Sequence, residues 1–191
     1  MFRYEFWLSL FLIAAAGGLF FYCRHKIYYH FKVVVPGQLY RSGTLGTVGL
    51  YMVGRQFKIK TIINLRTEKE YQRGSWYEKE SRFCKQNSIV LVDIPMKFDT
   101  PPDTNQIRRF LDVVMGPARQ PVLVHCEAGI IRTGMMVAVF LKHRFGTPNA
   151  EIVRQLPLFG HSLETEKRKN RKIKEFILNY QPVDPVPRDD V

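Results

Sequence analysis

Short apolar runs alternate with amphipathic stretches along most of this 191-residue chain. The runs are rich in β-branched residues and bounded by turn residues, so they predict strands, at residues 39–41, 61–65, 89–94 and 122–125. Segments of helical periodicity lie between and after them, at residues 45–55, 68–86 (interrupted by Gly74), 105–115, 134–145, a short helix opened by residues 148–151, and 163–180. Strands that alternate with helices predict an α/β fold, in which a small central mixed sheet carries helices on both faces.

The N-terminal segment departs from this pattern. Residues 6–23 are eighteen positions without a charge, which is about the minimum length for a bilayer span. They are apolar on every side, so a core helix fits poorly, and we expect one uncleaved transmembrane helix within an anchor at residues 1–27. A cleavable signal peptide is the competing interpretation, with Arg3 as its basic start and residues 14–16, all alanine, as its cleavage-like site.

The charges that flank this segment predict its orientation. Arg3 alone precedes it, whereas Arg24, Lys26 and Lys32 follow it. The positive-inside rule therefore places the rest of the chain in the cytoplasm. The excess is small, and an exported or periplasmic domain is the alternative.

The remaining chain divides into a folded domain at residues 28–181 and a tail at 182–191. Residues 28–36 are predicted to be a juxtamembrane linker that enters the first strand. Pro182, Pro185 and Pro187 predict an extended, disordered tail. The three cysteines are too few and too widely spaced for a disulfide framework or a metal site, which favours a reduced domain. Cys84 lies on an amphipathic stretch, where we expect a buried core thiol.

The net charge of +12 and the pI near 9.8 raise the question of an anionic partner. The densest basic run, residues 167–174, overlaps apolar residues at helical spacing, Ile173, Phe176, Ile177 and Tyr180. This pattern predicts an amphipathic helix with a basic outer face. That face is either simply solvated or attracted to an anionic membrane surface. No nucleic acid is expected, because no recognised motif or row of stacking aromatic residues accompanies the charge.

Residues 124–134, VHCEAGIIRTG, concentrate the chemistry of the chain. The pattern predicts a strand that ends at Cys126, a loop of five residues, and a helix that opens near Arg132. The small residues Ala128 and Gly129 let backbone N–H groups turn inward as an anion-binding nest, and the positive end of the helix points at the same place. A thiol at that focus should have a lowered pKa. Arg132 adds a planar donor matched to phosphate oxygens.

The pattern His-Cys-x-x-Gly-x-x-Arg-Thr-Gly resembles the signature of the cysteine-dependent protein-tyrosine and dual-specificity phosphatases. Three further segments, residues 37–43, 61–66 and 93–96, resemble the opening strand, the second strand and the acid-loop approach of the small bacterial and plant-fungal atypical members. The resemblance covers about residues 35–180 and implies the cysteine phosphatase fold.

The resemblance also implies a role for each residue of the loop. Cys126 is the nucleophile that forms a phosphocysteine intermediate, and Thr133 assists the thiolate as it leaves, or caps the helix. Phosphate is bound by the side chain of Arg132 and by the backbone of Glu127, Ala128, Gly129, Ile130, Ile131 and Arg132. His125 and Gly134 support the loop. No metal and no cofactor is needed.

A general acid and two further arginines complete the candidate site. Of three aspartates before the loop, Asp93 ends a strand and is expected to be structural, and Asp103 is positioned as a helix N-cap. Asp99 is therefore the candidate acid, although it stands closer to Cys126 in the sequence than in many relatives. Arg41 and Arg66 end strands at the edge where α/β sheets bind ligands. Three interpretations are open for these arginines: they contact the substrate phosphate, they hold the acid loop, or they are surface residues without a role.

We expect a phosphorylated protein as the substrate, with a phosphoinositide or another lipid phosphate as the alternative. The acid Glu127 and the aliphatic Ile130 and Ile131 inside the loop favour phosphotyrosine, phosphoserine or phosphothreonine of proteins, because phosphatases of highly charged inositol lipids tend to carry Lys or Arg there. A membrane anchor and a basic surface favour a phosphoinositide or another lipid phosphate. A phosphate-binding pseudophosphatase and a rhodanese-like sulfur-transfer enzyme are weaker alternatives, since the catalytic residues are intact and the Arg-Thr-Gly helix start suits phosphate.

Overall fold

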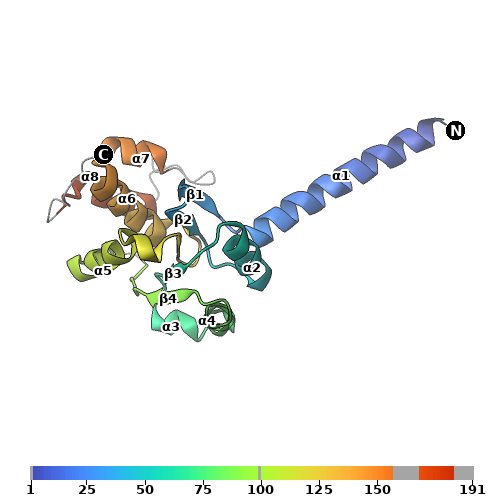
Figure 1. The fold of residues 1–191 in the computed structure, drawn as a ribbon. Helices are drawn as coiled ribbons and strands as arrows, with labels where there is room; N and C mark the ends of the chain where they lie inside the picture. Colours follow the sequence, from blue (N-terminus) through green and yellow to red (C-terminus); the bar gives the residue numbers. More distant parts are fainter. Residues whose placement is uncertain (1, 99, 157–167, 183–191) are drawn as a thin grey trace.

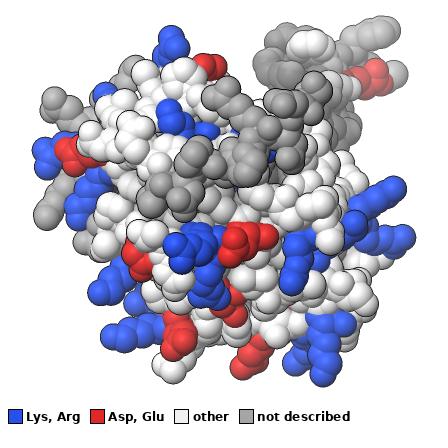
Figure 2. Space-filling model, turned by 60° about the vertical axis from the view of Figure 1, so that its left-hand side comes forward, with Lys and Arg blue, Asp and Glu red and all other residues white. Residues whose placement is uncertain are grey.

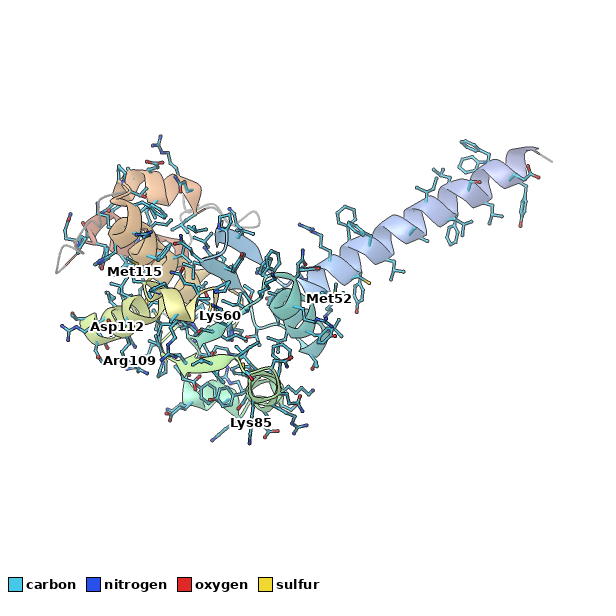
Figure 3. The ribbon with its side chains drawn as sticks, viewed as in Figure 1. Met52, Lys60, Lys85, Arg109, Asp112 and Met115 are labelled. Carbon is cyan, nitrogen blue, oxygen red and sulfur yellow. The ribbon has the colours of Figure 1, made fainter. Side chains whose placement is uncertain are left out.

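The computed structural model describes residues 2–98, 100–156 and 168–182 of the chain. Its first element is helix α1 (Phe2–Ile27), which projects as a single long helix from an α/β body (Figure 1). Within the described residues, one helix is long and apolar enough to cross a membrane, Tyr4–Ile27, with mean hydropathy 1.9 and none of it buried. Its side chains radiate on all sides without packing partners along most of its length (Figure 3). A signal sequence meets the same criteria.

The body is built on a five-stranded sheet in the order β1-β2-β5-β3-β4. The strands are β1 (Lys32–Val35), β2 (Leu39–Ser42), β3 (Thr61–Asn64), β4 (Val90–Asp93) and β5 (Val122–His125). Strand β1 is antiparallel to β2, and all other neighbours are parallel. Ser42 and Asn64 lie opposite His125 in the register, so β2, β3 and β5 end at one edge. The mixed sheet predicted from the sequence is confirmed.

Strand β1 corrects one prediction. The sequence predicts a linker at residues 28–36, but Val33 and Val35 within it pair with β2, with an irregularity between them, through a tight turn that contains Gly37 at φ +73°. A run of β-branched residues this short is stable only as the edge of an existing sheet, which local pattern does not reveal. The four other strands agree with their predicted positions to within one residue at each end.

Helices cover both faces of the sheet, as the alternating pattern predicts (Figure 1). They are α2 (Thr47–Gln56), α3 (Glu68–Tyr71), α4 (Trp76–Gln86), α5 (Thr104–Val114), α6 (Ile131–Phe145), α7 (Asn149–Gln155) and α8 (Arg168–Asn179), with a 3₁₀ turn at Pro117–Arg119. Side chains alternate across the sheet: Leu39, Ile63 and Val124 pack with α5, α6 and α8 on one face. Tyr40, Ile62 and Leu123 pack with α2 and α4 on the other.

Two side-chain predictions are confirmed by the packing. The Cys84 side chain is buried in the second core, and burial, with the nearby Glu80 and Asp93, raises the pKa of its thiol to about 12. In α8, Ile173 and Ile177 are buried while Arg171 faces solvent, and Tyr180, directly after the helix, is also buried. The predicted start of this helix at residue 163, and all of the predicted disordered tail 182–191 except its first residue, lie outside the described residues. Lys and Arg side chains are spread over much of one face of the molecule, with acidic ones between them (Figure 2).

Candidate active site

The catalytic-loop candidate connects β5 to α6. The strand ends at His125, and α6 begins at Ile131, three residues earlier than the segment predicted from its apolar run. Cys126 is therefore held between the end of a buried central strand and the N-terminus of a buried helix. Its exposed fraction is 3%.

Neighbouring segments hold the carbonyl groups of this loop away from its centre. The Thr44 hydroxyl donates to the Cys126 carbonyl (3.1 Å), and the Thr44 N–H donates to the Glu127 carbonyl (3.0 Å). The Arg41 guanidinium donates to the Gly129 carbonyl (2.6 Å). Because a trans peptide unit is planar, each carbonyl held outward turns the following N–H toward the loop centre. These contacts give the loop the backbone orientation that an anion-binding nest requires.

Gly129 is required at its position for two reasons. Its φ of +70° lies in the left-handed region that favours glycine. A Cβ atom there would also collide with the carbonyl group of Ser42. The glycine of the motif thus allows the loop to pass directly over the end of β2.

The thiol of Cys126 lies among groups that favour its ionised form. The Gly129 N–H donates to its sulfur at 3.2 Å. Burial alone would raise the pKa of the Cys126 thiol, but the positive charge of Arg132 and hydrogen bonds from Thr133 and Gly129 outweigh it and lower that pKa. Thr133 is completely buried beside it. A buried thiolate with donors on one side is suited to nucleophilic attack.

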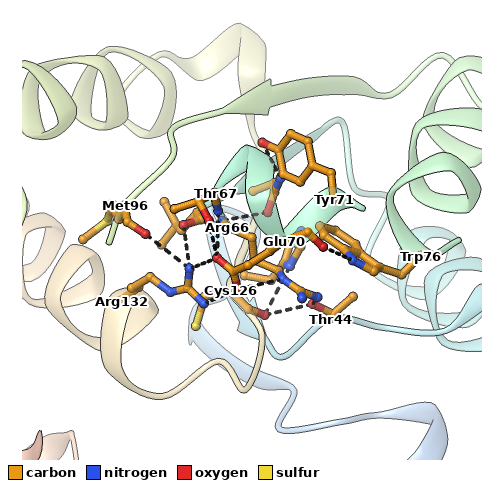
Figure 4. A network of polar contacts seen from close by, with 12 residues as sticks. Thr44, Arg66, Thr67, Glu70, Tyr71, Trp76, Met96, Cys126 and Arg132 are labelled. Atoms are coloured by element: carbon orange, nitrogen blue, oxygen red, sulfur yellow. Dashed lines mark hydrogen bonds and ion pairs between the residues drawn. The ribbon is translucent and has the colours of Figure 1, made fainter. Parts of the chain in front are cut away.

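Arg132 is fixed by Glu70, a residue that the sequence reasoning missed. The Arg132 guanidinium donates to both Glu70 oxygens, at 2.6 and 3.0 Å (Figure 4). Thr67 also donates to Glu70 through its N–H and its hydroxyl, forming a capping box on α3. Burial raises the pKa of the Glu70 carboxyl, but the donors from Arg132 and Thr67 outweigh it and lower that pKa to about 2. The Thr-x-x-Glu spacing of a capping box was the available sequence signal.

Both of the strand-end arginines are buried, which excludes the surface alternative. Arg66 donates to Glu70 (3.3 Å) and to the Thr44 hydroxyl (3.1 Å), and its guanidinium lies 3.9 Å from the centre of the Trp76 ring (Figure 4). Arg41 is 1% exposed and contacts the loop backbone. Arg41 thus supports the backbone of the loop, and Arg66 supports Glu70, which holds Arg132.

His125 forms a second buried pair that the sequence did not indicate. Its Nε2 lies 3.1 Å from a Glu80 carboxylate oxygen, and both side chains are 1% exposed. Burial lowers the pKa of His125, but the charge and hydrogen bond of Glu80 outweigh this effect and raise it. His125 also approaches the Cys126 carbonyl with its other ring nitrogen, at 3.4 Å. The pair anchors the end of β5 against α4.

The described aspartates have structural partners. Asp93 accepts hydrogen bonds from Tyr77 (2.6 Å), Tyr71 (3.1 Å) and Asn64 (2.8 Å). Asp103 caps α5 by accepting from the N–H of Gln106 at 2.8 Å, as its position before the helix predicts. Asp99, the candidate acid, lies outside the described residues.

An open pocket of about 1010 Å³ lies above this constellation, with Arg132 in its lining. Its walls come from the start of α3 and from the segment between β4 and α5. Three basic side chains line it, Lys69, Arg73 and Lys97, together with acidic residues that include Glu127. Across the residues described, there is no group of three or more His, Cys, Asp or Glu side chains arranged to hold a metal ion.

Known proteins are similar to this chain in sequence and in fold. Residues 37–178 match a family described as DSP-PTPase phosphatase fused to NAD+ kinase. Inositol diphosphatase SIW14 of Saccharomyces cerevisiae is 30% identical over 112 residues, which are 56% of this chain and 38% of that protein. The chloroplastic NAD kinase 2 of Arabidopsis thaliana is 25% identical over 146 residues, 75% of this chain and 13% of that protein. The chain thus spans well under half the length of these relatives.

Solved structures agree with the fold. The Siw14 catalytic core superposes with a TM-score of 0.64 at 23% identity, covering 80% of this chain and 85% of that one. TpbA of P. aeruginosa in complex with pTyr gives a TM-score of 0.61 at 15% identity, covering 79% and 84%. With the family model matched over most of the chain and the cysteine loop in place at the sheet edge, the chain belongs to the family of DSP-PTPase phosphatases.

Proposed function

We propose that this phosphatase acts on a compact, phosphate-rich substrate of the inositol pyrophosphate class through a phosphocysteine intermediate. The observation that carries this proposal is a wide pocket that Arg132 lines together with Lys69, Arg73 and Lys97. The charge of the same Arg132 lowers the pKa of the Cys126 thiol. A single phosphate needs only the loop and Arg132. Three further cations on the walls are suited to additional phosphate groups of the same molecule.

The reaction follows from the groups around the sulfur. The Cys126 thiolate attacks phosphorus in line with the leaving oxygen, so that the S–P bond forms as the P–O bond breaks. Arg132 and the N–H groups of residues 127–131 stabilise the charge on the equatorial oxygens. Water then attacks the phosphocysteine, the S–P bond breaks, and the sulfur leaves as a thiolate that the Thr133 hydroxyl stabilises.

The leaving group also favours an anhydride. An alkoxide needs a proton as it departs, whereas a phosphate group leaves with its charge already delocalised. Asp93 is held by three donors and Asp103 caps a helix, so neither is available as a general acid where it lies. We assign proton donation to Asp99 for ester substrates and expect it to matter least for a pyrophosphate. The similarity to an inositol diphosphatase supports the same substrate class.

Phosphotyrosine of proteins is the second candidate. Aliphatic residues inside the loop, Ile130 and Ile131, together with the acidic Glu127, favour a substrate with a single phosphate. The structural similarity to a TpbA complex with pTyr points the same way. A phosphoinositide is a third candidate: its headgroup carries several phosphate groups, as the first candidate does, but it lies on a membrane.

The test is kcat/KM of the full chain in detergent on an inositol pyrophosphate, a phosphotyrosine peptide and phosphoinositide vesicles. We expect the inositol pyrophosphate to be preferred, and Lys69→Gln to raise its KM about tenfold, since one charge-assisted contact is lost. Lys85→Gln, an exposed position on α4 (Figure 3), is the matched control. Cys126→Ser should abolish turnover on every substrate. Preference for the peptide, with no effect of Lys69→Gln, would contradict the proposed substrate class.

We further propose that α1 anchors the phosphatase domain, residues 28–181, in a membrane with the domain on the cytoplasmic side. The exposed apolar surface of the helix over Tyr4–Ile27 supports anchoring. The basic residues that follow it support this orientation, as does the requirement of the Cys126 thiolate for a reducing compartment. Export after signal cleavage is the alternative outcome.

A further inference from the structure

The short segment between α1 and β1 contacts the catalytic loop directly. The Tyr29 carbonyl accepts a hydrogen bond from the Gly43 N–H (2.8 Å), beside the end of β2. The next residue, His30, places its Nδ1 at 2.7 Å from the carbonyl oxygen of Ala128. Its ring is stacked on that of Tyr29, with centroids 4.5 Å apart. The segment predicted to be a linker therefore packs against the site.

The His30 contact has a defined polarity. A carbonyl oxygen only accepts hydrogen bonds, so the Nδ1 of His30 must carry the proton and donate it. Both the cation and one neutral tautomer of imidazole provide that donor.

The peptide unit that His30 contacts is the one that faces the nucleophile. The Ala128 carbonyl and the Gly129 N–H belong to the same planar unit and point in opposite directions. The Gly129 N–H donates to the Cys126 sulfur at 3.2 Å. Holding the oxygen from outside therefore aims the donor at the sulfur.

We propose that His30 is a positioning residue for the phosphatase reaction, which orients the Ala128–Gly129 peptide toward the Cys126 thiolate and ties the catalytic loop to the segment that follows α1. The proposal rests on Cys126 as the nucleophile of the proposed function. The neighbouring carbonyls are held by Thr44 and Arg41, so His30 supplies the donor for the one peptide that they do not hold.

The expected effect is partial, because other charged and titratable groups face the sulfur. Arg132 and Thr133 stabilise the thiolate independently, and His125 and Arg41 contribute charge from the buried side. Loss of one oriented donor should reduce kcat/KM about 3- to 10-fold below the thiol pKa and shift the acid limb of the pH profile upward by about half a pH unit or more.

Two substitutions separate the donor from the ring. His30→Phe keeps an aromatic ring to stack on Tyr29 and removes the donor. His30→Asn removes the ring but keeps an N–H donor, and asparagine tolerates the positive φ of 53° at this position. His25→Ala is the control, since His25 is an exposed histidine whose ring contacts are with Tyr29 and His30.

The experiment measures the rate of alkylation of Cys126 by iodoacetamide against pH in the full chain, read from the peptide mass so that Cys23 and Cys84 do not interfere. We expect a higher midpoint for His30→Phe and nearly unchanged midpoints for His30→Asn and His25→Ala, with melting temperatures reported for each. An unchanged midpoint in His30→Phe, or an equal shift in His30→Asn, would overturn the proposal. Alkylation needs no turnover, so this experiment is independent of the proposed function. If the midpoints are as expected but the protein hydrolyses no phosphate, the positioning role of His30 is supported and the proposed function is refuted.

Discussion

Glu70→Gln is the substitution that most directly tests how the phosphate clamp is held. The Glu70 carboxylate accepts from Arg132, Arg66 and Thr67 at once, and its side chain is nearly buried. Glutamine has almost the same shape but lacks the charge, and its amide N–H₂ would face the guanidinium of Arg132. The change therefore removes the electrostatic partner without creating a cavity.

The magnitude follows from the pKa of the carboxyl, which is lowered from 4.5 to about 2. Each unit of pKa shift corresponds to about 1.4 kcal/mol. The charged carboxylate therefore contributes at most about 3 kcal/mol to the free energy of unfolding. Water in the adjoining pocket screens part of this, so we expect the free energy of unfolding to fall by about 1 to 3 kcal/mol at pH 7. Since the carboxyl pKa is lowered in the folded state, this stabilisation is complete above pH 4.5 and is lost as the pH falls toward 2.

The assay is urea unfolding of the full chain at several pH values, together with steady-state kinetics. The variant should be less stable at pH 7, and its difference from wild type should shrink below pH 4.5. Its kcat should fall about 10- to 100-fold, because the guanidinium loses its orientation. Glu78→Gln, an exposed acid on α4, is the matched control and should change stability by less than about 0.5 kcal/mol. Equal stability of the two variants at pH 7, or a difference that is as large at pH 2 as at pH 7, would refute the reasoning.

Four further outcomes are expected. Arg132→Lys should lower kcat/KM by a factor equivalent to several kcal/mol of transition-state stabilisation, since a point charge cannot replace a bidentate clamp. A decrease in kcat/KM of less than tenfold would contradict this. Asp99→Asn should lower turnover of poor leaving groups about 10²-fold and flatten the basic limb of the pH profile, whereas the same result in Asp103→Asn would reassign the acid. Gly129→Ala should destabilise the loop, measured as loss of both activity and melting temperature, because its Cβ collides with the end of β2. Because residues 6–23 are expected to span the membrane, the full chain should resist carbonate extraction from membranes. A reporter fused after the last residue should behave as cytoplasmic, whereas cleavage near residue 16 would indicate export.

The sequence predicted the elements whose pattern is local. Strands β3, β4 and β5 show β-branched residues between turn residues, and α5 shows helical periodicity. The edge strand β1 was missed because its stability comes from pairing with β2 rather than from its own four residues. The loop motif predicts a helix that opens near Arg132, and α6 begins one residue earlier, at Ile131. The apolar run at 134–145 alone does not include the first three residues of this helix.

The same distinction applies to the site. Cys126 through Arg132 are contiguous, so their spacing alone predicted the loop. Their supports come from distant segments: Glu70 lies 62 residues from Arg132, Thr44 lies 82 residues from Cys126, and His30 lies 98 residues from Ala128. Such contacts are created by topology, because parallel strands bring their carboxyl ends to one edge. A single sequence identifies the residue types but does not show which distant residues contact one another.

The pattern of satisfied and unsatisfied donors explains why so many supports surround one short loop. Glu70 engages both terminal nitrogens of Arg132, while in the described part of the chain the Arg132 Nε and the Thr133 hydroxyl have no nitrogen or oxygen partner. Both residues interact with the Cys126 sulfur instead, and these interactions favour its ionised form. The supporting contacts thus keep the donors at the centre of the loop free of other oxygen acceptors and directed at the sulfur. If a phosphate group binds there, as we propose, the same donors can act on its oxygens at the point of attack.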